Sequence, residues 1–334
     1  MSCVVGFGDI LLRLSPPGYQ RFMQASNFEI NYTGAEANVL ASLAMNRVDV
    51  QFVTRIPTNP IAESALAFLH KYEIGTKYIA SGDGRMGLFY LEKGASQRPG
   101  RCIYDRQFSA FVNSQPSDYD WERIFSNATH FHLTGITPAL GNALPEICLD
   151  ACRTAKRMGL TVSLDLNYRA TLWSPDEAQR VMRSIVPYVD VLIGGREDAI
   201  KMLNVRVDAP NERLACEETA RILVDRFDLS AVAFTMRQST TASDHVYGAM
   251  LYHGNQSYYS KQYNIHLVDR VGGGDAFSAG LLYGLLHQFD PQHMVEFAAA
   301  AGCLKQTIEQ DFNLSSAEEI ERLVCSENSV RIQR

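Results

Sequence analysis

Short apolar segments alternate with helix-like segments along most of this chain, and this order restricts the folds that it can adopt. Cys3–Phe7 is an apolar run closed by a Gly-Asp pair, which is typical of a buried strand. A helix is predicted over Ala35–Met45, a strand over Val50–Thr54 and a second helix over Ile61–Tyr72. This β-α-β-α order predicts a mostly parallel sheet that is covered by helices on both faces.

Two stretches interrupt the alternation with strands alone. Gly87–Lys93 and Arg101–Arg106 alternate between apolar and polar residues and are bounded by glycine-containing turns, which predicts short antiparallel strands. Ser15–Tyr32 has a similar pattern after a Pro-Pro-Gly breaker. We therefore predict one α/β core and a small β-sheet lid. The predicted core comprises residues 1–14, 34–75 and 112–334, and the predicted lid comprises residues 15–33 and 76–111.

The alternation resumes after residue 117. Predicted strands are Thr129–Leu133, Leu160–Leu164, Val189–Ile193 and Ala231–Thr235, with a hairpin of Val246–Tyr252 and Ser257–Tyr263. Predicted helices are Ala143–Met158, Pro175–Ile185, Glu197–Leu203, Glu217–Phe227, Asp275–His287, Pro291–Gln306 and Ala317–Val324. Because ligands of open α/β sheets bind beyond the carboxyl ends of the strands, we expect functional residues there.

Composition excludes several classes of protein. With 334 residues, 46% hydrophobic and 20% charged, the chain can bury a large core and does not resemble a disordered, collagen-like or coiled-coil protein. Its net charge of −6 argues against nucleic acid or an anionic membrane as a partner. Seven scattered cysteines without a Cys-x-x-Cys pair, and a start without the pattern of a signal peptide, favour a cytoplasmic location.

The segment Val268–Gly280 carries the clearest chemical signal. Gly272–Gly274 stand directly before Asp275 and an apolar helical run. Glycines permit the close approach of a ligand, and a helix start presents unpaired N–H groups, so together they favour a phosphate or a developing anion. A carboxylate beside such a site is placed to take a proton from an attacking hydroxyl. The residues alone equally allow a simple glycine turn with Asp275 at a helix start.

Two further groups of polar residues are spaced for a binding site. Asp165, Asn167 and Arg169 follow a predicted strand, and in an extended chain their spacing of two would put all three on one side. By the same rule, Tyr104 and Arg106 share a face of a predicted lid strand. Arginine is suited to bidentate recognition of a carboxylate. A solvated turn and an exposed strand pair are the alternative interpretations.

The sequence VDRVGGGDAFSAG at Val268–Gly280 resembles the second signature of the ribokinase-like (PfkB) carbohydrate kinases, and GAEAN at Gly34–Asn38 is similar to their first signature. The resemblance covers nearly the whole chain. It implies an α/β fold with a ribokinase-like three-layer α/β/α core, a mostly parallel sheet and a small β-sheet lid. It also implies that Asp275 is the catalytic base and that the anion hole for the γ-phosphoryl group of ATP is formed by Gly272, Gly273 and Gly274.

Within this family, the chain is most similar to 2-keto-3-deoxygluconate kinases, through segments such as Leu11–Phe22 and Asp165–Trp173. The resemblance implies that ATP with Mg²⁺ phosphorylates the terminal hydroxyl of a 2-keto-3-deoxy sugar acid, 2-keto-3-deoxygluconate giving its 6-phosphate, and it allows a monovalent cation. Arg106 and Arg169 in one pocket would agree with an acidic sugar, since a neutral sugar does not need both. The implied substrate-binding residues are Asp9, Gly34, Ala35, Asn38, Tyr90, Tyr104, Arg106, Arg169, Asp275 and Asp311. The implied ATP-binding residues are Asp165, Asn167, Thr235, Arg237, Gly272 and Gly274.

The chain departs from the family pattern at two places that bear on function. Gly195 and Asp198 stand where Asn and Glu are common, in an element that acts on Mg²⁺ through water. Glu197 and Asp198 are therefore candidate water-mediated contacts, and no direct metal ligand is predicted. Phe89-Tyr90 reverses the commoner order, which leaves open whether Tyr90 faces the substrate.

Two alternative functions stay open at this point. One is a PfkB-type kinase of another sugar, such as fructose or a nucleoside, and the other is a non-catalytic sugar-binding protein of the same fold. The residues at Gly195 and Asp198 favour the non-catalytic alternative, whereas the intact Gly272–Asp275 segment favours a kinase. The predicted partners are the sugar acid and ATP, without nucleic acid or membrane. A homo-oligomer formed through the lid is also predicted, because exposed strand edges tend to be covered.

Overall fold

The computed structural model describes residues 3–325, so the ends of the predicted core, residues 1–2 and 326–334, lie outside the described residues. Its central sheet has nine strands: β1 (Cys3–Phe7), β4 (Asp49–Val53), β9 (His130–Thr134), β10 (Thr161–Asp165), β11 (Val191–Gly194), β12 (Ala231–Ser239), β13 (Asp244–His253), β14 (Gln256–Tyr259) and β15 (Tyr263–His266). Their order is β14-β13-β12-β11-β10-β9-β1-β4, with β15 paired to β13. The strands from β12 to β4 pair in parallel, and β13 is antiparallel to its three neighbours.

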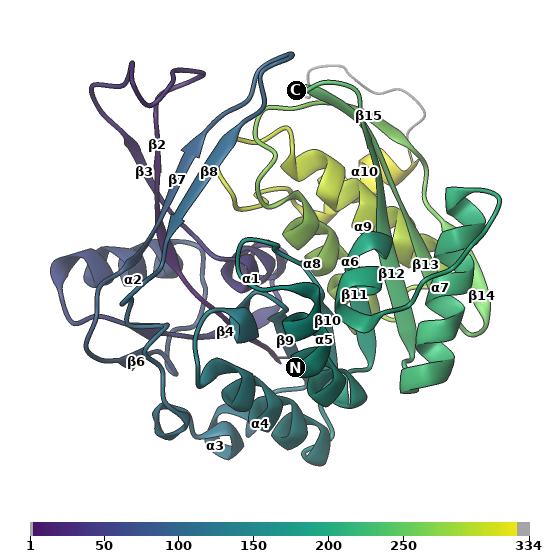
Figure 1. The fold of residues 1–334 in the computed structure, drawn as a ribbon, viewed down its shortest axis with the longest axis horizontal. Helices are drawn as coiled ribbons and strands as arrows, with labels where there is room; N and C mark the ends of the chain where they lie inside the picture. The colour runs from purple at the N-terminus through teal and green to yellow at the C-terminus, as the bar shows by residue number, and fades with distance from the viewer. Residues whose placement is uncertain (1–2, 326–334) are drawn as a thin grey trace.

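Helices cover both faces of this sheet, which confirms the predicted three-layer core (Figure 1). Because successive side chains of a strand point to opposite faces, Leu192 of β11 packs in one core, and Val191 and Ile193 pack in another. The face with Leu192 is covered by α3 (Trp121–Phe125), α4 (Leu144–Arg157), α5 (Pro175–Ile185), α6 (Arg196–Leu203) and α7 (Glu212–Phe227). The other face is covered by α1 (Ala35–Met45), α2 (Pro60–Lys71), α8 (Gly273–Leu286) and α9 (Pro291–Lys305), and α10 (Ala317–Cys325) packs on α9.

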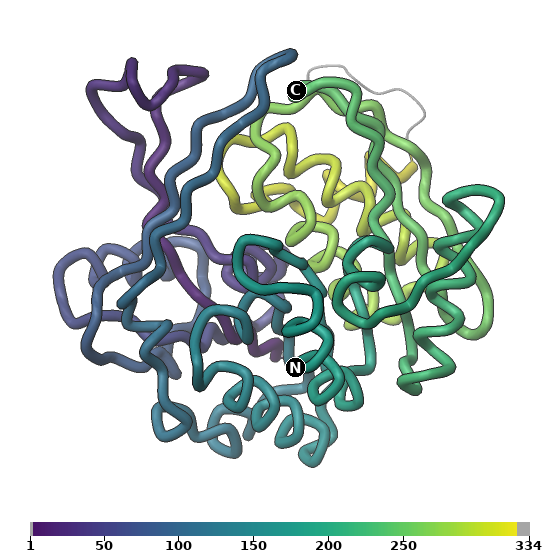
Figure 2. The backbone as a smooth tube through the Cα atoms, in the orientation of Figure 1, coloured from purple at the N-terminus to yellow at the C-terminus, as the bar shows by residue number. Residues whose placement is uncertain are grey.

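A second sheet stands beside the core, as Figure 1 shows. Its strands, in spatial order, are β3 (Glu29–Thr33), β2 (Leu11–Ser15), β7 (Gly87–Glu92) and β8 (Arg101–Asp105). Figure 2 shows its purple and blue segments side by side although they are far apart in the sequence. The expected antiparallel pairing of Gly87–Glu92 with Arg101–Asp105 is confirmed, whereas β2 and β7, which come from two separate excursions, run parallel. A two-residue pair, β5 (Arg55–Ile56) with β6 (Ala80–Ser81), links the same regions.

Several element boundaries differ from those predicted, for local reasons. β2 begins at Leu11, before the predicted start of the lid at residue 15. The seventh helix starts earlier than predicted because the side chain of Asn211 accepts a hydrogen bond from Leu214 N and caps it there. The short helix α3 was not predicted. Each helix between residues 3 and 325 is too short or too polar to cross a membrane.

Candidate active site

A cavity of about 1220 Å³ lies between the second sheet and the carboxyl ends of β10, β11 and β12. Its position agrees with the rule for open α/β sheets. The predicted site residues that line it are Gly34, Ala35, Asn38, Tyr104, Arg106, Asp165, Asn167, Arg169, Glu197, Asp198, Thr235, Arg237, Gly272, Gly273, Gly274 and Asp275. Three other predicted residues do not line it: Asp9, Tyr90 and Asp311.

Asp275 is the third residue of α8 and is held by a residue of α1. The side-chain amide of Asn38 donates to Oδ2 of Asp275 over 2.6 Å. Burial raises the pKa of Asp275 to about 7, and the hydrogen bond from Asn38 opposes that rise because it favours the charged carboxylate. A carboxyl group with a pKa near neutrality can accept a proton at physiological pH, so Asp275 has the properties of a general base.

The three glycines before Asp275 form the tight start of α8. Gly272 has φ 82° and precedes the first helical residue, and a Cβ there would lie 2.1 Å from the carbonyl oxygen of Asp311. Only glycine fits this conformation and this close approach. A Cβ on Gly274 would meet nothing within 4 Å, so this position opens on the cavity. Since the first N–H groups of a helix have no partner within it, this end of α8 suits an anion.

Asp165, Asn167 and Arg169 all line the cavity, but not for the predicted reason. The chain was expected to stay extended after β10, whereas Asn167 has φ 40°. Oδ1 of Asp165 accepts a hydrogen bond from Asn167 N over 3.1 Å, which stabilises a turn in place of an extended strand. Asparagine tolerates this left-handed conformation better than most residues.

Three arginines give one wall of the cavity a concentrated positive charge. Arg169 and Arg237 were predicted there, and Arg270 was not given a role although it lies within the quoted glycine signature. Burial and then the charge of Arg270 lower the pKa of Arg237, and burial and then Arg169 lower that of Arg270. Thr235 lies on the same wall. A polyanion such as a triphosphate would relieve this repulsion.

The second sheet contributes an arginine and two aromatic rings to the cavity. The guanidinium of Arg106 lies 4.3 Å from the ring centroid of Tyr104, which stacks on Phe89 at 4.7 Å. Nε of Arg106 also donates to Oδ2 of Asp9 over 3.1 Å. Asp9 does not line the cavity itself and lies behind its wall. Its other carboxylate oxygen, Oδ1, is buried and has no hydrogen-bond partner.

The resemblance implied a substrate contact for Tyr90, although the order Phe89-Tyr90 left its direction open, and Tyr90 does not line the cavity. Its ring packs 6.3 Å from that of Phe28, while its neighbour Phe89 lines the cavity. Because successive residues of a strand point to opposite faces, the order Phe89-Tyr90 puts the phenylalanine inside.

Acidic side chains also gather on the cavity wall. Burial, and then the charges of Asp275 and Asp198, raise the pKa of Asp165 to about 7. Oδ2 of Asp198 accepts a hydrogen bond from Gly195 N over 3.0 Å. Glu197 also lines the cavity. Between residues 3 and 325, no three acidic, histidine or cysteine side chains are grouped to hold a metal directly.

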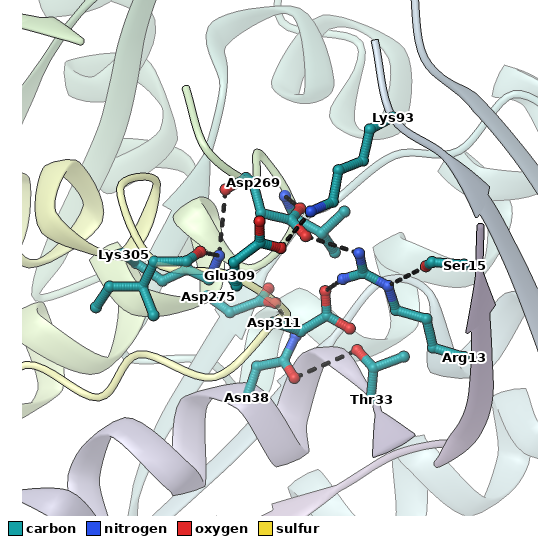
Figure 3. A network of polar contacts seen from close by, with 12 residues as sticks. Arg13, Ser15, Thr33, Asn38, Lys93, Asp269, Asp275, Lys305, Glu309 and Asp311 are labelled. Carbon is teal, nitrogen blue, oxygen red and sulfur yellow. Dashed lines mark hydrogen bonds and ion pairs between the residues drawn. The ribbon is translucent and has the colours of Figure 1, made fainter. Parts of the chain in front are cut away.

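Asp311 belongs to a buried ion network beside the cavity, shown in Figure 3. Arg13 of β2 donates to Oδ1 of Asp311 and, over 2.7 Å, to Oδ2 of Asp269. Lys305 of α9 completes the network through the backbone carbonyl of Asp269. No role was predicted from the sequence for Arg13, Asp269 or Lys305. Arg13 lies on the buried face of β2 with Leu11 and Ser15, whereas the sequence pattern alone would favour burial of Leu12 and Leu14.

Comparisons with known proteins agree with this geometry. The model of the pfkB family carbohydrate kinases matches residues 1–311. A 2-dehydro-3-deoxygalactonokinase of Haloferax volcanii is 31% identical over 321 residues, which are 96% of this chain and 96% of that protein. The crystal structure of a 2-dehydro-3-deoxygluconokinase of Thermotoga maritima has a TM-score of 0.95 at 46% identity, covering 97% of this chain and 98% of that one. The crystal structure of a PfkB family carbohydrate kinase of Listeria grayi has a TM-score of 0.92 at 31% identity, and the match covers 97% of this chain and 100% of that one. The chain belongs to the pfkB family of carbohydrate kinases.

Proposed function

We propose that this chain transfers the γ-phosphoryl group of ATP to the terminal hydroxyl of a 2-keto-3-deoxy sugar acid. One observation carries the proposal: Asp275, the glycine start of α8 and two arginines, Arg106 and Arg169, line a single cavity. They combine a base, an anion site and groups that recognise a carboxylate, which are the parts that this reaction needs.

Each part has a distinct task in the proposed reaction. Asp275 takes the proton from the sugar hydroxyl as that oxygen attacks phosphorus. The N–H groups that follow Gly272 stabilise the charge on the transferred group. Arg237 and Arg270 hold the nucleotide phosphates, with Thr235, Asp165 and Asn167 beside them. Phosphoryl transfer depends mainly on such positioning and charge stabilisation.

The sugar acid is bound at the side of the second sheet in this proposal. Arg169 and Arg106 recognise the carboxylate, and Asp9 orients Arg106 by accepting a hydrogen bond from its Nε. Gly34, Ala35 and Asn38 complete this end. The relatives are named for 2-dehydro-3-deoxygluconate and 2-dehydro-3-deoxygalactonate, which differ in the configuration of a hydroxyl. We propose that the preferred substrate is 2-dehydro-3-deoxygluconate, which is the same compound as 2-keto-3-deoxygluconate, and that the product is its 6-phosphate.

Membership of this family implies ATP with a divalent metal. The residues present fit an ion that is carried mainly by phosphates and water, because Asp165 and Asp198 crowd together and a cation would relieve their repulsion. We propose that the ion is Mg²⁺ and that Asp198 and Glu197 meet it through water. The metal would neutralise charge on the phosphates. Chelation should therefore abolish turnover while sugar binding, measured by thermal shift without nucleotide, persists.

A monovalent cation, which the resemblance allows, fits less well. Such an ion needs several oxygens that converge on one point. Beside the glycine loop, the carbonyls of Asp269 and Ile308 converge in this way, and both already accept hydrogen bonds from Lys305.

The experiment that tests the proposed function measures ADP release from ATP with a panel of sugars. The panel contains the glucono and galactono acids, fructose and a nucleoside. We expect turnover with a sugar acid, and we expect Asp275→Asn to lower kcat by several orders of magnitude while substrate binding is largely kept. Asp208→Asn, at an exposed position, is the matched control. Turnover confined to a neutral sugar would refute the substrate, and ligand-induced thermal shift without turnover would support the non-catalytic alternative.

We propose in addition that the second sheet acts as a lid and forms a homo-oligomer in the cytoplasm. Its two edge strands expose Ile30 at 63% and Ile103 at 53%, and Met23 in the connecting loop is 89% exposed. Apolar side chains so exposed on strand edges favour burial against a second copy. Sedimentation of the wild type and of Ile30→Glu, compared at equal concentration, tests this, and a monomeric wild type would refute it.

A further inference from the structure

Lys305 is a buried lysine that takes no direct part in the proposed reaction. It is the last residue of α9 and is 0% exposed. Its Nζ donates to the carbonyl oxygens of Asp269 and Ile308, each over 3.2 Å. Burial lowers the pKa of Lys305, and the carboxylates of Asp269 and Asp311 oppose this. A lysine is seldom fully buried unless it is paired, so this position calls for an explanation.

The ammonium group lies directly behind the proposed anion hole. A Cβ on Gly272 would come within 3.2 Å of Cε of Lys305. The carbonyl that Lys305 holds belongs to Asp269, just before the glycine loop. On the same side, Val268 N and Asp269 N donate to the carbonyl oxygen of Gln306 over 3.0 and 3.3 Å. Three hydrogen bonds therefore tie the start of the loop to the end of α9.

The surroundings of Nζ have the chemistry of a monovalent cation site. Two backbone carbonyls converge on it, two carboxylates lie close by, and the negative end of the α9 dipole adds to the field. Carbonyl oxygens arranged in this way replace the water shell of a small cation. A lysine ammonium carries the same single charge and has three hydrogens to donate.

The charges of the network balance only when Lys305 is included. Arg13 and Lys305 are positive, and Asp269 and Asp311 are negative. Without Lys305, an uncompensated carboxylate charge would lie behind the loop that receives the transferred phosphoryl group. Such a charge would oppose the anionic transition state, and the loop would lose one of its three anchors.

We infer that Lys305 is an internal cation that holds the Gly272–Gly274 loop in place and makes the enzyme independent of added monovalent cations. The inference rests on the proposed role of the glycine loop. Lys305 is a positioning residue, since it acts through the loop and touches neither the sugar nor the nucleotide in this arrangement.

The test compares the wild type with two variants in buffers of different monovalent cations. Turnover of the sugar acid is measured with Mg²⁺ and the tetramethylammonium salt of ATP in a tetramethylammonium buffer, and again after K⁺ or NH₄⁺ replaces tetramethylammonium. Lys305→Ala leaves a space with two free carbonyls, whereas Lys305→Met fills that space without a charge. Lys261→Ala is the matched control, because this exposed lysine donates to the carbonyl of Val324 and does not line the cavity.

We expect equal wild-type turnover in all buffers. Lys305→Ala should lose about 10²-fold in kcat through misplacement of the loop, with a nearly unchanged KM for the sugar acid. K⁺ or NH₄⁺ should raise the kcat of Lys305→Ala about tenfold and should raise the melting temperature of this variant. Lys305→Met should respond to neither ion. Stimulation of the wild type by K⁺, near-normal turnover of Lys305→Ala, or equal responses of the two variants would each overturn the inference. Absence of wild-type turnover in every buffer would instead count against the proposed function.

Discussion

Asn38 joins α1 to α8 through one short hydrogen bond, 2.6 Å from its side-chain amide to Oδ2 of Asp275. The bond joins the two signature segments, Gly34–Asn38 and Val268–Gly280, which lie far apart in the sequence. It orients the carboxylate and favours its charged form, against burial that favours the neutral form. The balance leaves the pKa of Asp275 at about 7, so its protonation changes within the physiological range.

This balance predicts that the activity of the wild type has an acid limb, which means that kcat/KM falls on the acid side of its pH profile. Asp275 acts as a base only when it is deprotonated, so kcat/KM should fall as the pH drops through about 7 and should level off above it. Asp165 has a raised pKa of about 7 as well, and its protonation would steepen the same limb. Initial rates with the sugar acid at subsaturating concentration measure the profile. A kcat/KM that stays constant well below neutrality would contradict the role of Asp275.

Removal of the amide should move that limb in a defined direction. In Asn38→Ala, the charged form of Asp275 loses its hydrogen bond, so the pKa rises and the acid limb shifts to higher pH. We also expect kcat at high pH to fall by about tenfold or more, because the carboxylate is no longer oriented. Asn46→Ala, at the other end of α1, removes hydrogen bonds to Ser42 and Ala317 and serves as the control for stability. An unshifted limb in Asn38→Ala would show that this bond does not tune the base.

Local patterns predicted the parts of this molecule whose causes are local. The alternation of strands and helices gave the parallel sheet, and the glycines before Asp275 located the start of α8. Asn167 was predicted to lie at the site, but the turn there was not predicted, because a hydrogen bond to Asp165 bends the chain where extension was assumed. Arg13 and Lys305 were missed for a different reason. Their partners, Asp311 and Asp269, lie far away in the sequence or bind through the backbone, and no local pattern encodes such contacts.

The substrate carboxylate should depend on Arg169. A hydrogen bond to a charged group contributes about 1.5–3 kcal/mol, so Arg169→Ala should raise KM for the sugar acid by roughly 10- to 10²-fold. Arg169→Lys should recover only part of this, because lysine lacks the bidentate geometry. Arg183→Ala, exposed on α5, is the control. The measurement is KM for the sugar acid and for ATP in parallel. A rise confined to ATP would assign Arg169 to the phosphates instead.

Arg13 should stabilise the fold more than any surface ion pair does. In Arg13→Met, the carboxylates of Asp269 and Asp311 stay buried without their main partner, which should cost about 3–5 kcal/mol in the free energy of unfolding. Arg157→Met breaks an exposed pair with Glu122 and should change little. Adding Asp311→Asn to Arg13→Met leaves one carboxylate, Asp269, balanced by Lys305, and should restore much of the loss. Urea unfolding of the four proteins measures this, and a loss in Arg13→Met no larger than in Arg157→Met would mean that the network does not hold the second sheet to the core.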